Sequence, residues 1–134
     1  MDFLQAIASC FNKYADFSGR ASRREYWFFF LFRVVTEYIA GMIDKTALQD
    51  YVHTYYIGHF AQQIGLLGII VGIFLILPSI SVACRRLHDV DRSGWWLLSA
   101  LTIIGAVFPL FFWVCTKGTQ GDNRFGPDPL AVKK

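Results

Sequence analysis

The chain has 134 residues and a formal net charge of +3, and 54% of its residues are hydrophobic whereas only 17% are charged. This length limits the chain to one domain at most, and the apolar excess sets its composition far from that of an average soluble protein. Its 13 Phe, 6 Tyr and 4 Trp exceed what the core of so small a protein can bury. Such a surplus favours lipid as the surrounding solvent.

The first fourteen positions predict a helix that lies on a membrane. Within 1–14, one helical face carries Phe3, Ile7, Cys10 and Tyr14, and the polar side chains lie elsewhere. This pattern is typical of an interfacial amphipathic helix rather than of a span. The segment lacks the basic start, the unbroken apolar core and the cleavage site of a secretory signal.

Three apolar windows follow, at 26–43, 64–83 and 95–115. The second and third contain no charged residue, and each matches the roughly 20 residues that cross a bilayer as a helix. The first window is of similar length but contains Arg33 and Glu37. The sequence therefore predicts an all-α, multi-pass helical membrane protein. It forms a single membrane domain over 1–134, with an interfacial N-terminal helix plus three membrane segments.

Polar side chains form a stripe along the first window, at Tyr26, Arg33, Glu37 and Asp44. Each charge at the bilayer centre costs roughly 2.5–3.5 kcal/mol, so two on one face call for partners or water. One interpretation is an Arg33–Glu37 pair that fixes helix packing. The other is a polar path lined by the stripe, in a small oligomeric transporter or ion-conducting protein. In the second window, Gly68 and Gly72 form a GxxxG motif through which an oligomer is possible.

The distribution of Lys and Arg predicts the orientation. Residues 1–25 hold four such cations, the 44–63 connector holds one and the 84–94 loop holds three. The positive-inside rule therefore places the N-terminus and the 84–94 loop in the cytoplasm, and the 44–63 loop on the extracytoplasmic side.

The tail at 116–134 does not fit this pattern, because it is basic and yet three simple spans would place it outside. One solution is an external tail. The other is a 95–115 segment that bends back, helped by Gly105 and Pro109. A re-entrant backbone survives at membrane depth only where protein covers it, so the simple span is the preferred prediction.

The charged block 84–96, CRRLHDVDRSGWW, separates the last two windows. Its plain interpretation is a solvated loop in which Arg85, Arg86 and Arg92 each gain roughly 1 kcal/mol from anionic headgroups. A zinc site needs three or four ligands, and no serine elbow, phosphate loop or HExxH motif is present. We therefore expect no enzyme, no metal or other cofactor and no nucleic-acid partner. An enzyme with His88 as its acid or base ranks third among the interpretations.

Three stretches together resemble a known family: DFSGRASRREYWFFFLF at 16–32, RRLHDVDRSGWWLL at 85–98 and GDNRFGPDP at 121–129. Their order and spacing are similar to the three signature blocks of the small bacterial inner-membrane proteins called domain of unknown function 805. The resemblance extends over nearly the whole chain but does not include 44–63. It implies a bacterial inner-membrane location, and it implies no activity.

The resemblance marks polar residues outside the apolar windows, and these define a candidate cytoplasmic cluster for binding. Its members are Arg20, Arg24, Glu25, Arg85, Arg86, His88, Asp89, Asn123 and Arg124. If the three blocks meet on one face, the cluster is either an interlocked cap or a site for an anionic headgroup or an acidic segment of a partner. We therefore expect a non-enzymatic membrane module that contacts the lipid bilayer and binds lipid headgroups or another membrane protein. The transporter is the alternative.

Overall fold

The computed structural model describes residues 1–47, 65–102 and 109–131, and every structural statement below concerns these residues. They form four α-helices and one 3-10 helix, η1. In chain order these are α1 (Phe3–Asn12), α2 (Arg23–Ala47), α4 (Leu66–Asp89), η1 (Gly94–Leu101) and α6 (Phe111–Cys115). No strand is present in this part of the chain apart from an isolated bridge between Asn123 and Gly126. The prediction of an all-α fold is confirmed for these residues.

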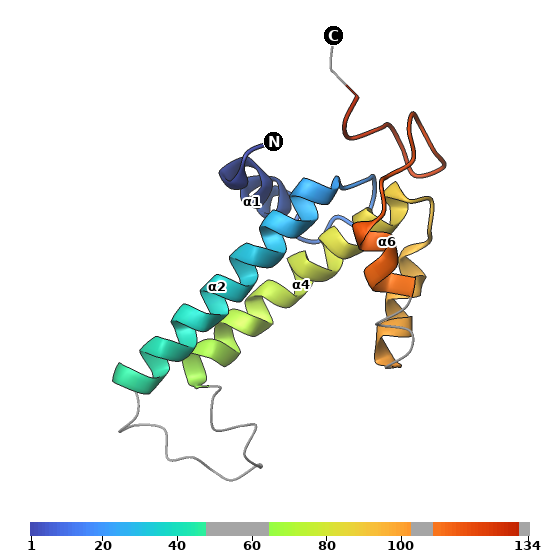
Figure 1. The fold of residues 1–134 in the computed structure, drawn as a ribbon. Coiled ribbons are helices and arrows are strands. Elements are labelled where there is room, and N and C mark those ends of the chain that lie inside the picture. The colour runs from blue at the N-terminus through green and yellow to red at the C-terminus, as the bar shows by residue number, and fades with distance from the viewer. Residues whose placement is uncertain (48–64, 103–108, 132–134) are drawn as a thin grey trace.

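Helices α2 and α4 lie side by side and form the long axis of the molecule (Figure 1). Both are long and apolar enough to cross a membrane. Large apolar side chains, among them Leu31, Tyr38, Ile70 and Ile73, are exposed along them. A surface of this kind is costly in water and is satisfied by lipid. The two helices therefore provide candidate spans for the first two predicted membrane segments.

Asp44, near the C-terminal end of α2, joins the two helices and is only 6% exposed. Its carboxylate oxygens accept hydrogen bonds from the backbone N–H groups of Leu67 (3.0 Å) and Gly68 (2.8 Å), in the first turn of α4. These groups have no partner within their own helix. A Cβ on Gly65 would lie 2.1 Å from Asp44 Cγ, so only glycine fits there. Asp44 thus caps a neighbouring helix, and a polar path along the stripe stays a prediction.

The two glycines of the predicted GxxxG motif have different surroundings. Gly68 lies in the turn that Asp44 caps. A Cβ on Gly72 would meet no atom within 4 Å in the described part of the chain. Close helix packing within the chain therefore does not require Gly72, and association with a second copy stays a prediction.

Helix α1 packs across α2 and α4 through Cys10 and Phe11. The Phe11 ring meets the rings of Phe29 and Phe32 edge-on, with centroids 5.9 Å apart in both pairs. The helix ends at Asn12, two residues before the predicted end. Its helical character is confirmed, whereas its position in a membrane interface stays a prediction.

The 84–94 segment differs from its prediction as a solvated loop. Helix α4 continues to Asp89, so the loop begins only at Val90. Arg85 and Arg86 both have an exposed fraction of 0%. The physical reason is charge compensation: carboxylates contributed by α2 and by the same turn of α4 neutralise both guanidinium groups, so the helix continues without solvating them.

The preferred prediction of a simple third span is not confirmed by the described residues. The described parts of 95–115 contain two short helices, η1 and α6, and each of them packs against α4 (Figure 1). The rings of Trp96 and Trp113 are 5.2 Å apart, so the start and the finish of the segment lie together. Sequence reasoning disfavoured a returning chain because it lacked cover. Arg86 supplies that cover by donating to the carbonyls of Val114 and Thr116.

Replacing Asp44 by Ala removes the acceptor of two backbone N–H groups that begin α4. We expect the free energy of unfolding to fall by about 1–2 kcal/mol, as for the loss of a helix cap. Reversible unfolding in mixed micelles, followed by circular dichroism, measures this loss. The neighbouring substitution Lys45→Ala, at an exposed position, serves as the control. Equal stability of the two variants would contradict the capping role.

Candidate functional site

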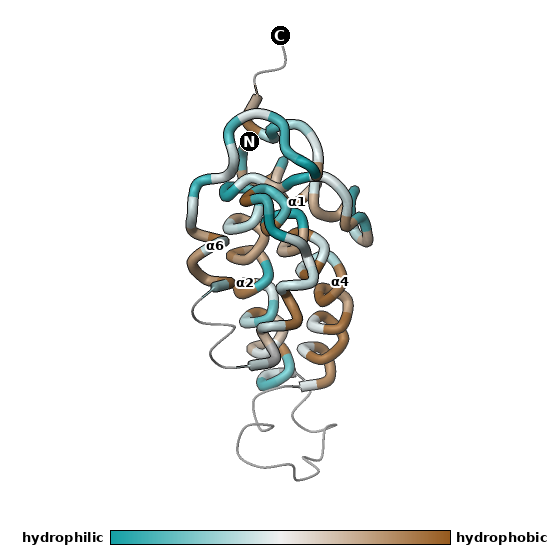
Figure 2. Tube along the Cα trace, turned by 90° about the vertical axis from the view of Figure 1, so that its right-hand side faces the viewer, coloured by the Kyte–Doolittle hydropathy of each residue, from teal (hydrophilic) through white to brown (hydrophobic). Residues whose placement is uncertain are grey.

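The predicted cluster lies at the polar end of the molecule, near the N-terminus. Figure 2 shows hydrophobic residues along α4 and hydrophilic residues gathered in the loops at this end. Here the segment before α2, the last two turns of α4 and the chain after α6 meet. We call this region the cap and define it as residues 16–25, 81–93 and 113–128.

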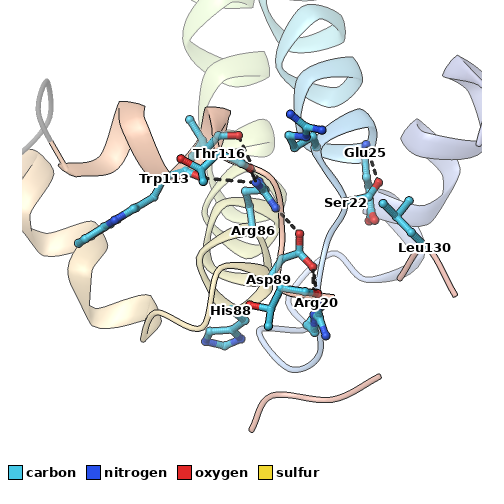
Figure 3. Close-up of polar contacts among 12 residues, drawn as sticks. Arg20, Ser22, Glu25, Arg86, His88, Asp89, Trp113, Thr116 and Leu130 are labelled. Atoms are coloured by element: carbon cyan, nitrogen blue, oxygen red, sulfur yellow. Dashed lines mark hydrogen bonds and ion pairs between the residues drawn. The ribbon is translucent and has the colours of Figure 1, made fainter. Parts of the chain in front are cut away.

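Asp89 occupies the centre of the cap (Figure 3). Its Oδ1 atom accepts from Arg20, at 3.0 Å from Nε and 2.9 Å from Nη2. Its Oδ2 atom accepts from Arg86 Nη1. One carboxylate therefore compensates two buried guanidinium groups, with Arg20 supplied by the loop before α2 and Arg86 by the same helix three residues earlier.

The same two guanidinium groups also bind carbonyl groups of α6 and of the chain that follows it. Arg20 donates to the carbonyls of Thr119 (2.5 Å) and Gly121 (2.6 Å). Arg86 donates to the carbonyl of Val114 (3.2 Å) and also to that of Thr116. Charge-assisted hydrogen bonds of this kind are stronger than neutral ones. The two arginines therefore fold the chain after α6 back onto the end of α4.

Two backbone features bring the chain after α6 against Asp89. The N–H of Thr119 donates to the carbonyl of Asp89 at 2.8 Å. A Cβ on Gly118 would lie 2.0 Å from Asp89 Oδ2, so a larger residue there displaces the carboxylate. Sequence reasoning missed Gly118, and the only signal was a glycine between two polar residues.

A second buried pair joins α2 to α4. Arg85 Nη1 donates to Glu25 Oε1 at 2.8 Å, and the hydroxyl of Ser9 in α1 donates to the same oxygen at 3.1 Å. Arg85 Nε and Nη2 are buried and have no hydrogen-bond partner in the described part of the chain. Cys10 lies against Glu25, and burial first, then this carboxylate, raises the pKa of its thiol to about 12. The thiol is therefore protonated and acts as a weak donor.

His88 is in contact with residues of the third signature block. Its Nδ1 atom lies 3.1 Å from the carbonyl of Gly19, and Nε2 lies 3.5 Å from Cys84 Sγ. The imidazole stacks on the Phe125 ring with centroids 3.9 Å apart and planes 2° apart. Asn123 Nδ2 donates to the His88 carbonyl at 2.9 Å. These contacts cover the side chain of His88, and this residue is only 9% exposed.

All nine cluster residues lie in the cap: seven meet in its interior, and two lie on its surface. The seven are Arg20, Glu25, Arg85, Arg86, His88, Asp89 and Asn123. Arg24 is exposed, and Arg124 pairs at the surface with Asp91 at 3.0 Å. The carbonyl groups of Thr116, Thr119 and Gly121 belong to the site but were missed, because backbone acceptors leave no mark in a sequence.

The polar stripe of the first segment separates into three environments. Tyr26 and Arg33 line a cavity, and Arg33 pairs with Glu37 at 2.8 Å. Asp44 caps α4 at the other end of the pair. Since both Asp44 oxygens are already bound to backbone N–H groups, the described residues do not favour the stripe as an ion path. In the same part of the chain, no group of three or more His, Cys, Asp or Glu is placed to hold a metal.

A family model described as "Protein of unknown function (DUF805)" matches residues 14–127. The chain belongs to this family. It is similar to the inner membrane protein YhaH of Escherichia coli strain K12, with 42% identity over 119 residues, 88% of this chain and 90% of YhaH. It is also similar to the inner membrane protein YhaI of the same strain, with 36% identity over 127 residues, 94% and 96% of the two chains. No solved structure matches it.

Membership of the DUF805 family confirms the resemblance drawn from the three signature blocks. Together with the apolar helices α2 and α4, it makes this chain a helical membrane protein of that family. The relatives' names state a location and no activity. The matched range begins after α1 and includes every described residue of the buried cap except Asp128.

In this DUF805 chain, Glu25→Ala would leave the Arg85 guanidinium buried without its carboxylate. We expect a loss of about 3–5 kcal/mol in the free energy of unfolding, because a lone buried charge is strongly destabilising. The double variant Glu25→Ala/Arg85→Met should recover most of that loss. Equilibrium unfolding in mixed micelles measures both.

Arg124→Ala breaks the exposed pair with Asp91 and provides the control for this prediction. The expected cost is at most about 1 kcal/mol, because exposed ion pairs contribute little. If Glu25→Ala costs no more than Arg124→Ala, the buried pair does not hold the cap together.

Proposed function

We propose that this protein is a non-enzymatic inner-membrane module that binds the headgroups of anionic lipids. The supporting observation is that the cations of the cap form two sets, one buried and one exposed. Arg20, Arg85 and Arg86 are buried, and carboxylates compensate them. A second set of cations at this end is exposed: Arg23, Arg24, Arg92 and Lys117. We therefore assign the contact with headgroups to this exposed set rather than to the buried cluster. We call the four residues the outer cations.

Each outer cation stands where an apolar helix meets the cap. Arg23 and Arg24 begin α2, Arg92 lies two residues before η1, and Lys117 lies two residues after α6. None of the four forms an ion pair with a carboxylate in the described part of the chain. Exposed Lys and Arg at this level of a membrane protein each gain roughly 1 kcal/mol from an anionic surface. Uncompensated charge at headgroup depth thus favours anionic lipid.

The buried cluster contributes by positioning the outer cations. Arg86 holds the carbonyl of Thr116, one residue before Lys117. The Arg85 carbonyl accepts from the Ala21 N–H at 2.9 Å, two residues before Arg23. Side chains on a pre-organised backbone lose less freedom on binding than those on a free loop. The interlocked cap and the headgroup site are in this way two parts of one surface.

The same charges support an orientation. The outer cations favour the cytoplasmic leaflet, so we place the N-terminus, the cap and the tail in the cytoplasm and the 44–63 connector on the other side. The location in the inner membrane is inferred from the names of the relatives. An acidic segment of a protein partner would use the same cations, and the experiment below separates the two.

Tryptophan fluorescence tests the proposal, since Trp27, Trp95, Trp96 and Trp113 lie close to the outer cations in sequence or in space. The protein is reconstituted in phosphatidylcholine with increasing brominated phosphatidylglycerol, which quenches nearby indoles. We expect the wild type to prefer phosphatidylglycerol over brominated phosphatidylcholine by roughly fivefold, as about 1 kcal/mol implies. Replacing the four outer cations by Gln should bring the ratio close to one.

Lys45→Gln removes an exposed cation at the opposite end of α2 and is the matched control, with no expected change. Raising the salt concentration should lower the wild-type preference, because exposed charges are screened. Equal quenching by the two lipids in the wild type would contradict headgroup binding and leave the protein partner as the remaining occupant of this surface.

A further inference from the structure

A cavity of about 520 Å³ lies between α2, α4 and η1, on the part of the helix pair next to the cap. Its walls are mainly apolar, with Phe29, Phe30, Ile76, Ile80, Leu97 and Leu98 among them. The volume lies within the range of about 300–1,000 Å³ that is typical of small-molecule sites. Four of these side chains are also exposed, namely Phe30, Ile76, Ile80 and Leu98, so the cavity communicates with the surroundings of the helices.

We propose that this cavity holds one acyl chain of an anionic phospholipid whose headgroup lies on the outer cations. This inference rests on the proposed function and names the lipid contact at that same surface more closely. The cavity lies on the two helices that are long and apolar enough to cross a membrane, so its exposed edge faces hydrocarbon. An acyl chain can therefore enter sideways without crossing water.

The polar groups in the cavity do not favour water as its occupant. A buried water needs two to four polar partners. The Ser79 hydroxyl donates to the Leu75 carbonyl at 2.6 Å, and Arg33 Nε donates to Glu37 at 2.8 Å. The Ser79 hydroxyl and one N–H of Arg33 are thus engaged inside the protein, and because most of the wall is apolar, an acyl chain satisfies it better than a cluster of waters.

The position of the outer cations relative to the cavity fits a phospholipid. Tyr26 lines the cavity and stands one helical turn after Arg23. On the opposite wall, Leu97 and Leu98 follow Arg92 within six residues. Cations thus stand on two sides of the end of the cavity near the cap. From Tyr26 to Arg33 the wall extends about 10 Å along α2, at 1.5 Å per residue. A phosphate at the cations and a chain along the wall match this arrangement.

Native mass spectrometry tests the inference on the full-length protein. The protein is reconstituted in vesicles of equal phosphatidylcholine and phosphatidylglycerol, extracted in a mild detergent and weighed with its retained lipid. We expect one phosphatidylglycerol per wild-type chain. Ala83→Phe fills the cavity from α4 and Leu98→Trp fills it from η1, and each should lower the retained lipid at least tenfold.

Ile73→Phe is the matched control, because it enlarges a 65% exposed residue of α4 that does not line the cavity. It should retain lipid as the wild type does. Two cavity variants on different elements are used so that misfolding of one does not decide the result. A wild type without retained lipid, or full retention in both folded cavity variants, would overturn the inference. So would a wild type that retains a second copy of the chain in place of lipid.

The same experiment separates this inference from the proposed function. Retention of phosphatidylcholine as often as phosphatidylglycerol, with loss in both cavity variants, supports the acyl-chain site and contradicts headgroup selectivity. A wild type that retains no lipid, but keeps its fluorescence preference for phosphatidylglycerol, contradicts the acyl-chain site and leaves headgroup binding standing.

Discussion

The carboxylate of Asp89, shared by Arg20 and Arg86, is the interaction on which the arrangement of the cap depends. A buried guanidinium without a counter-charge costs several kcal/mol, so the two arginines and this acid are stable only together. Each arginine also donates to carbonyl groups between 113 and 126. The two ion pairs of Asp89 therefore determine where the chain after α6 lies. They also determine which cations of the cap are buried and which are exposed.

The long helices were predictable because their signal is local. An uncharged apolar run such as 64–83 needs no knowledge of the rest of the chain to be identified as a helix. The end of α4 was not predictable in this way. It continues through Arg85 and Arg86 to Asp89, since Arg85 is neutralised by Glu25, a partner 60 positions away. Periodicity carries no information on such a partner.

The returning third segment shows the same limit. Gly105 and Pro109 raised the possibility of a bend. Whether the segment returns or crosses the membrane depends on whether another group can bind the carbonyls at the end of α6. The side chain of Arg86 does so, but the sequence predicted this residue only as a solvated cation. Resemblance to the family grouped the three signature blocks correctly. It did not distinguish the inward Arg20 from the outward Arg24, because charge and spacing are alike for both and only burial separates them.

The side of the membrane that the tail occupies tests the central claim, which is that the three signature blocks share one cap. Reporter proteins that are active on only one side of the inner membrane are fused after Arg92, after Lys134 and within the 44–63 connector. If the three blocks share one cap, the fusions after Arg92 and Lys134 report the same side and the connector fusion reports the opposite one. Opposite sides for Arg92 and Lys134 would mean that 95–115 crosses the membrane, and the shared cap would then be wrong.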